Sequence, residues 1–188
     1  MIVYFENMTA PYIVVMDVEH DQGKLLQYAG VLFQRVGDSL YQISKSINFY
    51  IKRDAVSNFT AYFTHITEKF LQQYGITEEE AVEQFNQFLE DIPHEDIIFV
   101  SHGIHQDSMV MQESGLNIED SPHLCTHRLA RTVLCRDKKL KLSDILAEAG
   151  LCTVLEHNAY TDALETAWVL SFLLKNGGSK SYGKIYKY

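Results

Sequence analysis

The sequence predicts one mixed α/β domain, and three observations carry this prediction. The first third of the 188 residues is rich in strand-like runs, the middle alternates between strand and helix patterns, and a long helical stripe comes near the end. No internal repeat or interior linker interrupts these patterns. We therefore expect a single domain over residues 1–176, followed by a basic and aromatic tail at 177–188.

The central strand is predicted from Tyr12, where a run of apolar and mostly β-branched residues begins. This run ends in two carboxylates, Asp17 and Glu19. Side chains alternate along a strand, so these two share one face while Val18 points to the other. Neighbouring buried carboxylates repel each other, and a divalent cation between them removes that cost. A strand whose polar end simply meets water explains the pair equally well.

Two further runs, at 25–36 and 40–52, predict the next two strands. They meet at Gly37-Asp38, which is typical of a hairpin turn. Three antiparallel strands are therefore the expected start of the sheet.

The pattern then becomes helical. Aromatic and apolar residues recur at helical intervals from Phe59 to Phe70, and Thr77 with Glu80 predicts a capping box at the start of the next helix. Trp168 falls on the apolar stripe of the last helix, which predicts a core position. The remaining expected elements are a buried strand at 97–100, a helix at 106–113, a small strand near Leu124, helices at 128–134 and after Ser143, and a final helix at 159–175.

The composition limits the classes of function. A net charge of −9 argues against a protein that coats nucleic acid through bulk electrostatics, and it favours an enzyme that acts at a chain end. Cys125, Cys135 and Cys152 lack zinc-ligand or Cys-x-x-Cys spacing, which predicts reduced thiols in a cytosolic protein. No signal-like segment or run of membrane-spanning length is present in the sequence, so we expect a cytoplasmic protein without membrane contact.

Two more groups of polar residues point to chemistry. Asp107 follows the buried strand at 97–100, at the start of a helix, and His157 stands five residues before Asp162 in the first turn of the last helix. Each of these groups alone is weak evidence for a catalytic site, because an aspartate near a helix start often only complements the helix dipole. Their combination with the Asp17-Val18-Glu19 strand is much harder to explain by chance.

These residues resemble, in order and spacing, the three motifs of the DEDDh 3′→5′ exonucleases. That family includes the proofreading epsilon subunit of bacterial DNA polymerase III, RNase T and oligoribonuclease. The resemblance runs from about Ile13 to Leu174. Segments between the motifs also resemble family segments, and they lie at 64–71, 124–131 and 141–146.

The resemblance implies a ribonuclease H-like fold, with a mixed β-sheet flanked by helices, and two-metal phosphodiester hydrolysis. Asp17, Glu19, Asp107 and Asp162 would hold two Mg²⁺ or Mn²⁺ ions, because hard cations prefer carboxylate oxygen. His157 would be the general base, since an imidazole is largely unprotonated at neutral pH and can take the proton of the attacking water.

By the same resemblance, Val18, His20, His65 and His102 would lie at the nucleic acid, although His102 could instead support the turn in which it stands. Two departures from the family pattern concern the substrate. His20-Asp21 stands where the family commonly has threonines, and Thr64-His65 replaces a His-Gly pair. Neither departure removes a catalytic group.

The function expected from the sequence is a 3′→5′ exonuclease that shortens single-stranded DNA and releases nucleoside monophosphates. One alternative is an exoribonuclease similar to RNase T or oligoribonuclease, and another is a module that binds nucleic-acid ends without cleaving them. A polymerase, a helicase or a CRISPR adaptation factor is a possible protein partner, and homodimerisation is open. Lysines and tyrosines alternate in the tail, which could stack on a single strand, dock on a partner or stay poorly ordered.

Overall fold

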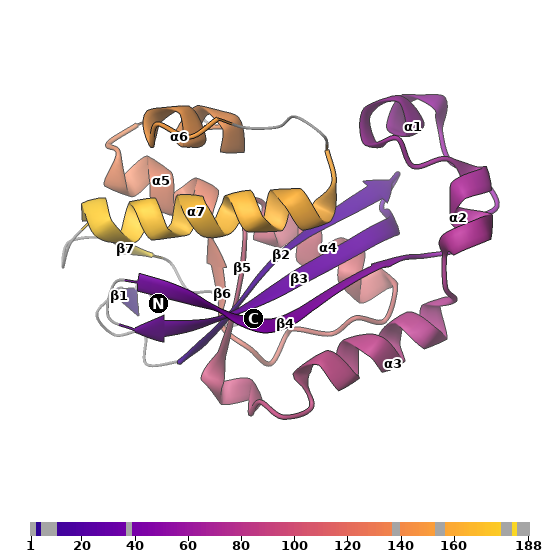
Figure 1. Cartoon of the computed structure of the whole chain (residues 1–188), viewed down its shortest axis with the longest axis horizontal. Helices are drawn as coiled ribbons and strands as arrows, with labels where there is room; N and C mark the ends of the chain where they lie inside the picture. Colours follow the sequence, from indigo (N-terminus) through magenta and orange to yellow (C-terminus); the bar gives the residue numbers. More distant parts are fainter. Residues whose placement is uncertain are drawn as a thin grey trace.

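The computed structural model describes residues 3–4, 11–36, 39–136, 140–152, 157–177 and 182–183. A five-stranded sheet with the order β4-β3-β2-β5-β6 lies at the centre, between two layers of helices (Figure 1). Strands β2, β3 and β4 are antiparallel neighbours, whereas β5 runs parallel to β2 and β6 runs parallel to β5. The strands are β2 (Tyr12–Asp21), β3 (Lys24–Val36), β4 (Ser39–Tyr50), β5 (Ile97–Ser101) and β6 (His123–Cys125). The predicted α/β class with a mixed sheet is confirmed.

Each face of the sheet has its own core. Helices α3 (Glu78–Leu89) and α4 (Ile104–Glu113) cover one face, and α5 (Thr126–Val133), α6 (Leu142–Glu148) and α7 (Ala159–Gly177) cover the other. The alternation along β2 decides which side chain meets which layer. Ile13 and Val15 pack toward α7, whereas Val14, Met16 and Val18 pack toward α3 and α4.

The antiparallel hairpin of β3 and β4 forms as expected, with Val36 opposite Ser39. The predicted turn itself, Gly37-Asp38, lies outside the described residues. Between β2 and β3 the register shifts after Glu19, so that Glu19 faces Gln27 and His20 faces Leu25. A bulge of this kind re-aims the side chains that follow it.

The segment from Phe59 to Phe70 is divided into two helices, α1 (Asn58–Thr64) and α2 (Glu68–Tyr74). His65 ends α1 with φ +59°, a left-handed conformation that a helix cannot continue through, and the Thr67 side chain caps α2. The helical interval therefore indicated helix correctly but missed this break. The capping box of Thr77 and Glu80 is present at the start of α3, as predicted.

The structure corrects the predicted core position of Trp168. Its side chain is 52% exposed, although its stripe on α7 predicted a core position. Ala163, Ala167 and Leu170 face the sheet and are buried, and Trp168 follows Ala167 by one residue, about 100° around the helix. The structure therefore places Trp168 beside the buried stripe, where it meets solvent, and the predicted core position is wrong.

Part of the tail is ordered against the start of the chain. Strand β7 (Tyr182–Gly183) pairs antiparallel with β1 (Val3–Tyr4), and the rest of 178–188 lies outside the described residues. Among the described residues, no helix is both long and apolar enough to cross a membrane. The three cysteines are free thiols, as predicted, with Cys125 buried and the other two exposed.

Candidate functional site

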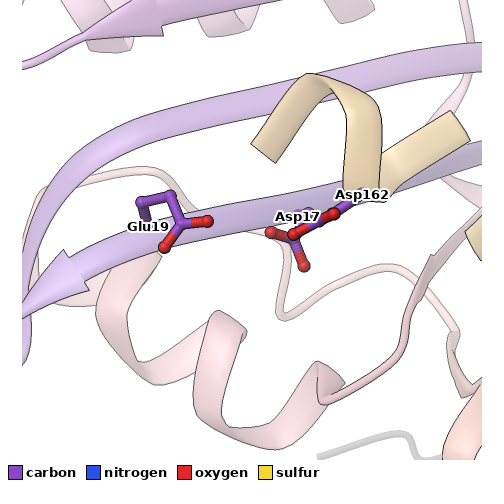
Figure 2. A group of neighbouring side chains, drawn as sticks. All are labelled: Asp17, Glu19 and Asp162. Carbon is purple, nitrogen blue, oxygen red and sulfur yellow. The ribbon is translucent and has the colours of Figure 1, made fainter. Parts of the chain in front are cut away.

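Three carboxylates gather where β2 meets the first turn of α7. One oxygen from each of Asp17, Glu19 and Asp162 lies within 4.8 Å of the others (Figure 2). Asp17 and Glu19 stand two residues apart on β2 and share its α7 face, while Asp162 approaches from α7. We call these three residues the carboxylate triad. Residues 145 positions apart in sequence thus form one cluster, as the sequence predicted for these acidic groups.

The start of α7 is fixed by hydrogen bonds that hold Asp162 over β2. The Asn158 side chain accepts hydrogen bonds from the backbone N–H groups of Tyr160 and Thr161, at 3.1 and 3.4 Å, and so caps the helix. Gln27, which is fully buried on β3, accepts from the backbone N–H of Ala159 at 3.2 Å and donates to Asn48 on β4 at 3.0 Å. The sheet therefore sets the position of Asp162 through Gln27.

The triad is electrostatically strained without a cation. Burial raises the pKa of Asp17 well above its usual value, and the charges of Asp107, Asp162 and Glu19 raise it further. Burial, followed by repulsion from Asp162 and Asp107, raises the pKa of Glu19 to about 8. Burial and the Glu165 carboxylate raise the pKa of Asp162 to about 6, against the opposing effect of His157. Such a cluster favours either protons or cations.

Asp107 lies close to the triad but is turned toward a different partner. Its carboxylate accepts a hydrogen bond from the Ser101 hydroxyl, and the Ser101 oxygen in turn accepts one from the backbone N–H of Gly103. Asp107 is 9% exposed, and burial raises its pKa although hydrogen bonds from Ser101 lower it. Within the described residues, Asp107 is not part of the compact cluster, but its charge still acts on Asp17 and Glu19.

His157 stands at the solvent side of the triad, one residue before the helix cap Asn158. Its side chain is exposed, its backbone has φ +40°, and its ring lies edge-on to Phe63 of α1, with 6.0 Å between centroids. Its charge lowers the pKa of Asp162. The structure therefore brings His157 to the same site as Asp162, with its side chain exposed to solvent.

The four residues predicted to lie at the nucleic acid have different surroundings. His20 lies beside α4, with its Nε2 atom 2.7 Å from Gln106 Nε2, and the exposed His65 occupies the left-handed break after α1. Val18 is only 7% exposed and packs in the core, so only its main chain can meet a ligand. His102 has Nδ1 3.0 Å from Thr126 Oγ1 and Nε2 3.0 Å from the Leu140 carbonyl, which favours its role as a support of the turn.

Sequence reasoning missed three residues that shape the site. The role of Gln27 could not be predicted, because a polar residue in an apolar strand does not indicate which distant residue it will hydrogen-bond. Glu165 lies three residues after Asp162, is 6% exposed and raises the pKa of Asp162. Asp21 accepts hydrogen bonds from Ser57 and Thr60 and so ties α1 to the end of β2. Helical spacing could have revealed Glu165, because residues three apart share a helix face.

The triad fits a hard divalent cation. Its members offer carboxylate oxygens, which Mg²⁺ and Mn²⁺ prefer, and a cation would relieve the repulsion that raises their pKa values. Clusters of carboxylates that hold divalent cations occur in metal-dependent phosphodiester hydrolases. Fold and site together are those expected of a metal-dependent hydrolase.

Comparison with known proteins agrees with this class. A family model described as exonuclease matches residues 15–170. The fold is similar to that of cell-death related nuclease 4, with a TM-score of 0.74 and 20% identity over 93% of this chain and 66% of that one. It is also similar to the nuclease domain of 3′hExo, a DEDDh family member bound to rAMP, with a TM-score of 0.74 and 15% identity over 95% of this chain and 97% of that one.

E. coli exonuclease I in complex with a dA16 oligonucleotide has a TM-score of 0.71 and 14% identity. That match covers 88% of this chain but only 41% of exonuclease I, so this chain spans less than half of that protein. No curated protein sequence matches this chain.

This chain belongs to the exonuclease family. The expected ribonuclease H-like fold and the predicted resemblance to the DEDDh exonucleases are confirmed.

Proposed function

We propose that this protein is a metal-dependent 3′→5′ exonuclease that removes nucleoside monophosphates from single-stranded DNA. The carboxylate triad carries the proposal, because its three carboxylates lie within 4.8 Å of one another at the end of a buried strand. A purely structural role would not explain why three mutually repelling acids are held together there. A polynucleotide end with its bound cations is a ligand that such a cluster attracts.

Asp17, Glu19 and Asp162 would hold the cations, and Asp107 would assist from its place beside Ser101. When bound, divalent cations supply Lewis-acid activation of the attacking water and stabilise the charge that develops on the leaving oxygen. The protein supplies position: β2 fixes two of the carboxylates, and the capped start of α7 fixes the third. This rigid frame would keep the scissile phosphate in one orientation.

His157 would act as the general base. Its ring is exposed beside the triad and can accept the proton of the attacking water and release it to solvent. The edge-on contact with Phe63 restricts the ring on one side, which supports a defined orientation.

RNA is the alternative to the proposed DNA substrate. The structure of E. coli exonuclease I with a dA16 oligonucleotide supports DNA by analogy, and the nuclease domain of 3′hExo bound to rAMP supports RNA. The same residues would serve either polymer, because phosphodiester hydrolysis needs no contact with the 2′ position. A module that only binds nucleic-acid ends would not need the complete set of Asp17, Glu19, Asp107, His157 and Asp162.

The test uses single-stranded DNA and RNA oligonucleotides of one sequence, labelled at the 5′ end, with Mg²⁺, Mn²⁺ or EDTA. A ladder that shortens from the 3′ end with metal, and that Asp17→Asn abolishes, is the expected result. A circular single strand should resist the enzyme, because it offers no end. Cleavage of the circle, or equal activity of the Asp17→Asn variant, would contradict the proposal, and the faster linear polymer identifies the substrate.

A further inference from the structure

Helix α1 presents aromatic side chains to solvent. None of its seven residues, all of which the structure describes, is buried. Phe59 and Tyr62 are 74% and 75% exposed, and Phe63 is 43% exposed. Exposed aromatic surface of this kind is costly in water, and a contiguous patch usually marks a binding surface.

The aromatic residues of α1 form a continuous row that reaches the site. The rings of Phe59 and Phe63 lie 4.7 Å apart between centroids, and those of Tyr62 and Phe63 lie 5.3 Å apart. Phe63 then meets the His157 ring at 6.0 Å. The row therefore leads from open solvent to the histidine beside Asp162, and Figure 1 shows α1 next to the start of α7.

Asp21 fixes this row relative to the carboxylates. Its carboxylate accepts hydrogen bonds from the Ser57 backbone N–H at 2.9 Å, the Ser57 hydroxyl at 2.7 Å and the Thr60 hydroxyl at 2.7 Å. Asp21 ends β2, two residues after Glu19. The same strand thus holds two members of the triad and the start of α1, and the aromatic row has a defined place beside the site.

The chemistry of α1 suits unpaired bases. The segment from Ser57 to Ile66 contains no Asp or Glu, although the whole chain has 25 acidic residues and a net charge of −9. A polyanion can therefore approach this helix without local repulsion from its own side chains. Aromatic rings bind any base through its π-face, which suits a strand of arbitrary sequence.

We propose that Phe59 and Tyr62 form a stacking platform for unpaired bases on the 5′ side of the scissile phosphate. This proposal rests on the proposed function, since it takes the 3′ end of the strand to lie at the triad. It adds a substrate preference: single strands several nucleotides long should bind better than a strand too short to reach α1. Phe63 links the platform to His157, and Asp21 positions the platform.

The test measures binding separately from hydrolysis. Fluorescence anisotropy measures the dissociation constant of a 12-nucleotide single strand that carries a fluorophore at its 5′ end and no label at its 3′ end. Ca²⁺ replaces Mg²⁺ in this binding measurement, because carboxylates also bind Ca²⁺. A second strand carries abasic sites in place of the internal bases. Wild type is compared with a Phe59→Leu/Tyr62→Leu double variant, which keeps apolar side chains but removes the rings, and with Tyr74→Ala, which alters another exposed aromatic residue, on α2.

We expect the double variant to bind the normal strand about ten-fold or more weakly than wild type does, because stacking on each ring contributes substantially per base. The abasic strand should bind wild type weakly and lose little more in the double variant, and Tyr74→Ala should bind like wild type. Equal dissociation constants for wild type and the double variant would overturn the platform. Melting curves of the variants check that each is folded.

Hydrolysis of the same 12-nucleotide strand with Mn²⁺ keeps the two proposals apart. A wild type that binds through the platform but never cuts would contradict the exonuclease mechanism and leave the platform supported. A wild type that cuts, together with a double variant of unchanged affinity, would support the exonuclease and overturn the platform. In that second case a protein partner becomes the expected occupant of the aromatic surface.

Discussion

The carboxylate triad and helix α1 lie on two sides of His157, and they are built in opposite ways. The triad stands on β2 and α7, two of the elements that form the core, and its acids are held together against their own repulsion. Helix α1 has no buried residue and is joined to β2 through the Asp21 side chain. The proposed chemistry thus rests on rigid, strained core elements, whereas the proposed recognition surface is an exposed helix whose side chains can vary without disturbing the core.

This contrast predicts that damage to the triad affects activity far more than damage to α1. Asp17→Asn should reduce hydrolysis by about 10³-fold or more, beyond the usual effect of losing one electrostatic contact in a site. The same change removes a buried, repelled charge, so the metal-free variant should unfold at a higher temperature than wild type at pH 8. Oligonucleotide assays and thermal melts measure the two effects. A variant that is both active and less stable would break the comparison.

His157→Ala tests the residue that lies between the two regions, and it separates proton transfer from metal binding by the triad. Turnover should fall by about 10²–10⁴-fold, the usual effect of a positioned general base, while affinity for Mn²⁺ changes little. Single-turnover kinetics and metal titration measure these quantities. His94→Ala is the matched control, since His94 is exposed in the short 3-10 helix (His94–Asp96) that precedes β5, away from the triad. Normal turnover in His157→Ala would remove the base assignment but leave the triad in place.

Asp21→Asn tests the attachment of α1. The amide keeps one oxygen for hydrogen bonding but loses the charge that serves Ser57 and Thr60 together. We expect the kcat/KM for a 12-nucleotide single strand to fall by roughly ten-fold, mainly through KM, because stacking needs α1 in place. Initial-rate kinetics across strand lengths measure this. A fall in kcat alone, equal at all lengths, would place Asp21 with the triad instead.

The pH dependence of stability should also differ between the two regions. The pKa of Glu19 is raised to about 8, so the folded metal-free protein binds a proton that the unfolded chain has released, and stability falls as the pH rises from about 4.5 to 8. Asp21 behaves oppositely. Burial alone would raise its pKa, but hydrogen bonds from Thr60 and Ser57 lower it, so its contribution is lost as the pH falls through the lowered value.

We therefore expect the melting temperature of the metal-free protein to fall by on the order of 10 °C between pH 5 and pH 8, because three pH units below the pKa of Glu19 correspond to about 4 kcal/mol and each kcal/mol to about 2–4 °C at this chain length. Mg²⁺ should remove most of the fall, because cations replace the protons in the triad. Calorimetry at several pH values with EDTA or Mg²⁺ measures it. Stability that rises over this range with EDTA would show that the acids are not strained.

Many features of the fold and of the candidate site could be predicted from the sequence, because they depend on local patterns of residues. The alternation after Tyr12 put Asp17 and Glu19 on one face, and Thr77 with Glu80 marked the start of α3 through a capping box. Hydrophobic periodicity and capping depend on neighbours along the chain, so the chain alone reveals them. The order of the acidic motifs then indicated the family.

The tertiary structure decided what depends on distant residues. Gln27 holds the start of α7 and Asp21 ties down α1, and each of these hydrogen bonds joins segments that lie far apart in the sequence and that no local pattern pairs. Trp168 was misplaced for the same reason, since the face that a helix buries depends on how it lies on the sheet. The sequence by itself determined the acids and their class of chemistry, and only the packing of α7 and α1 against β2 decided which groups surround them.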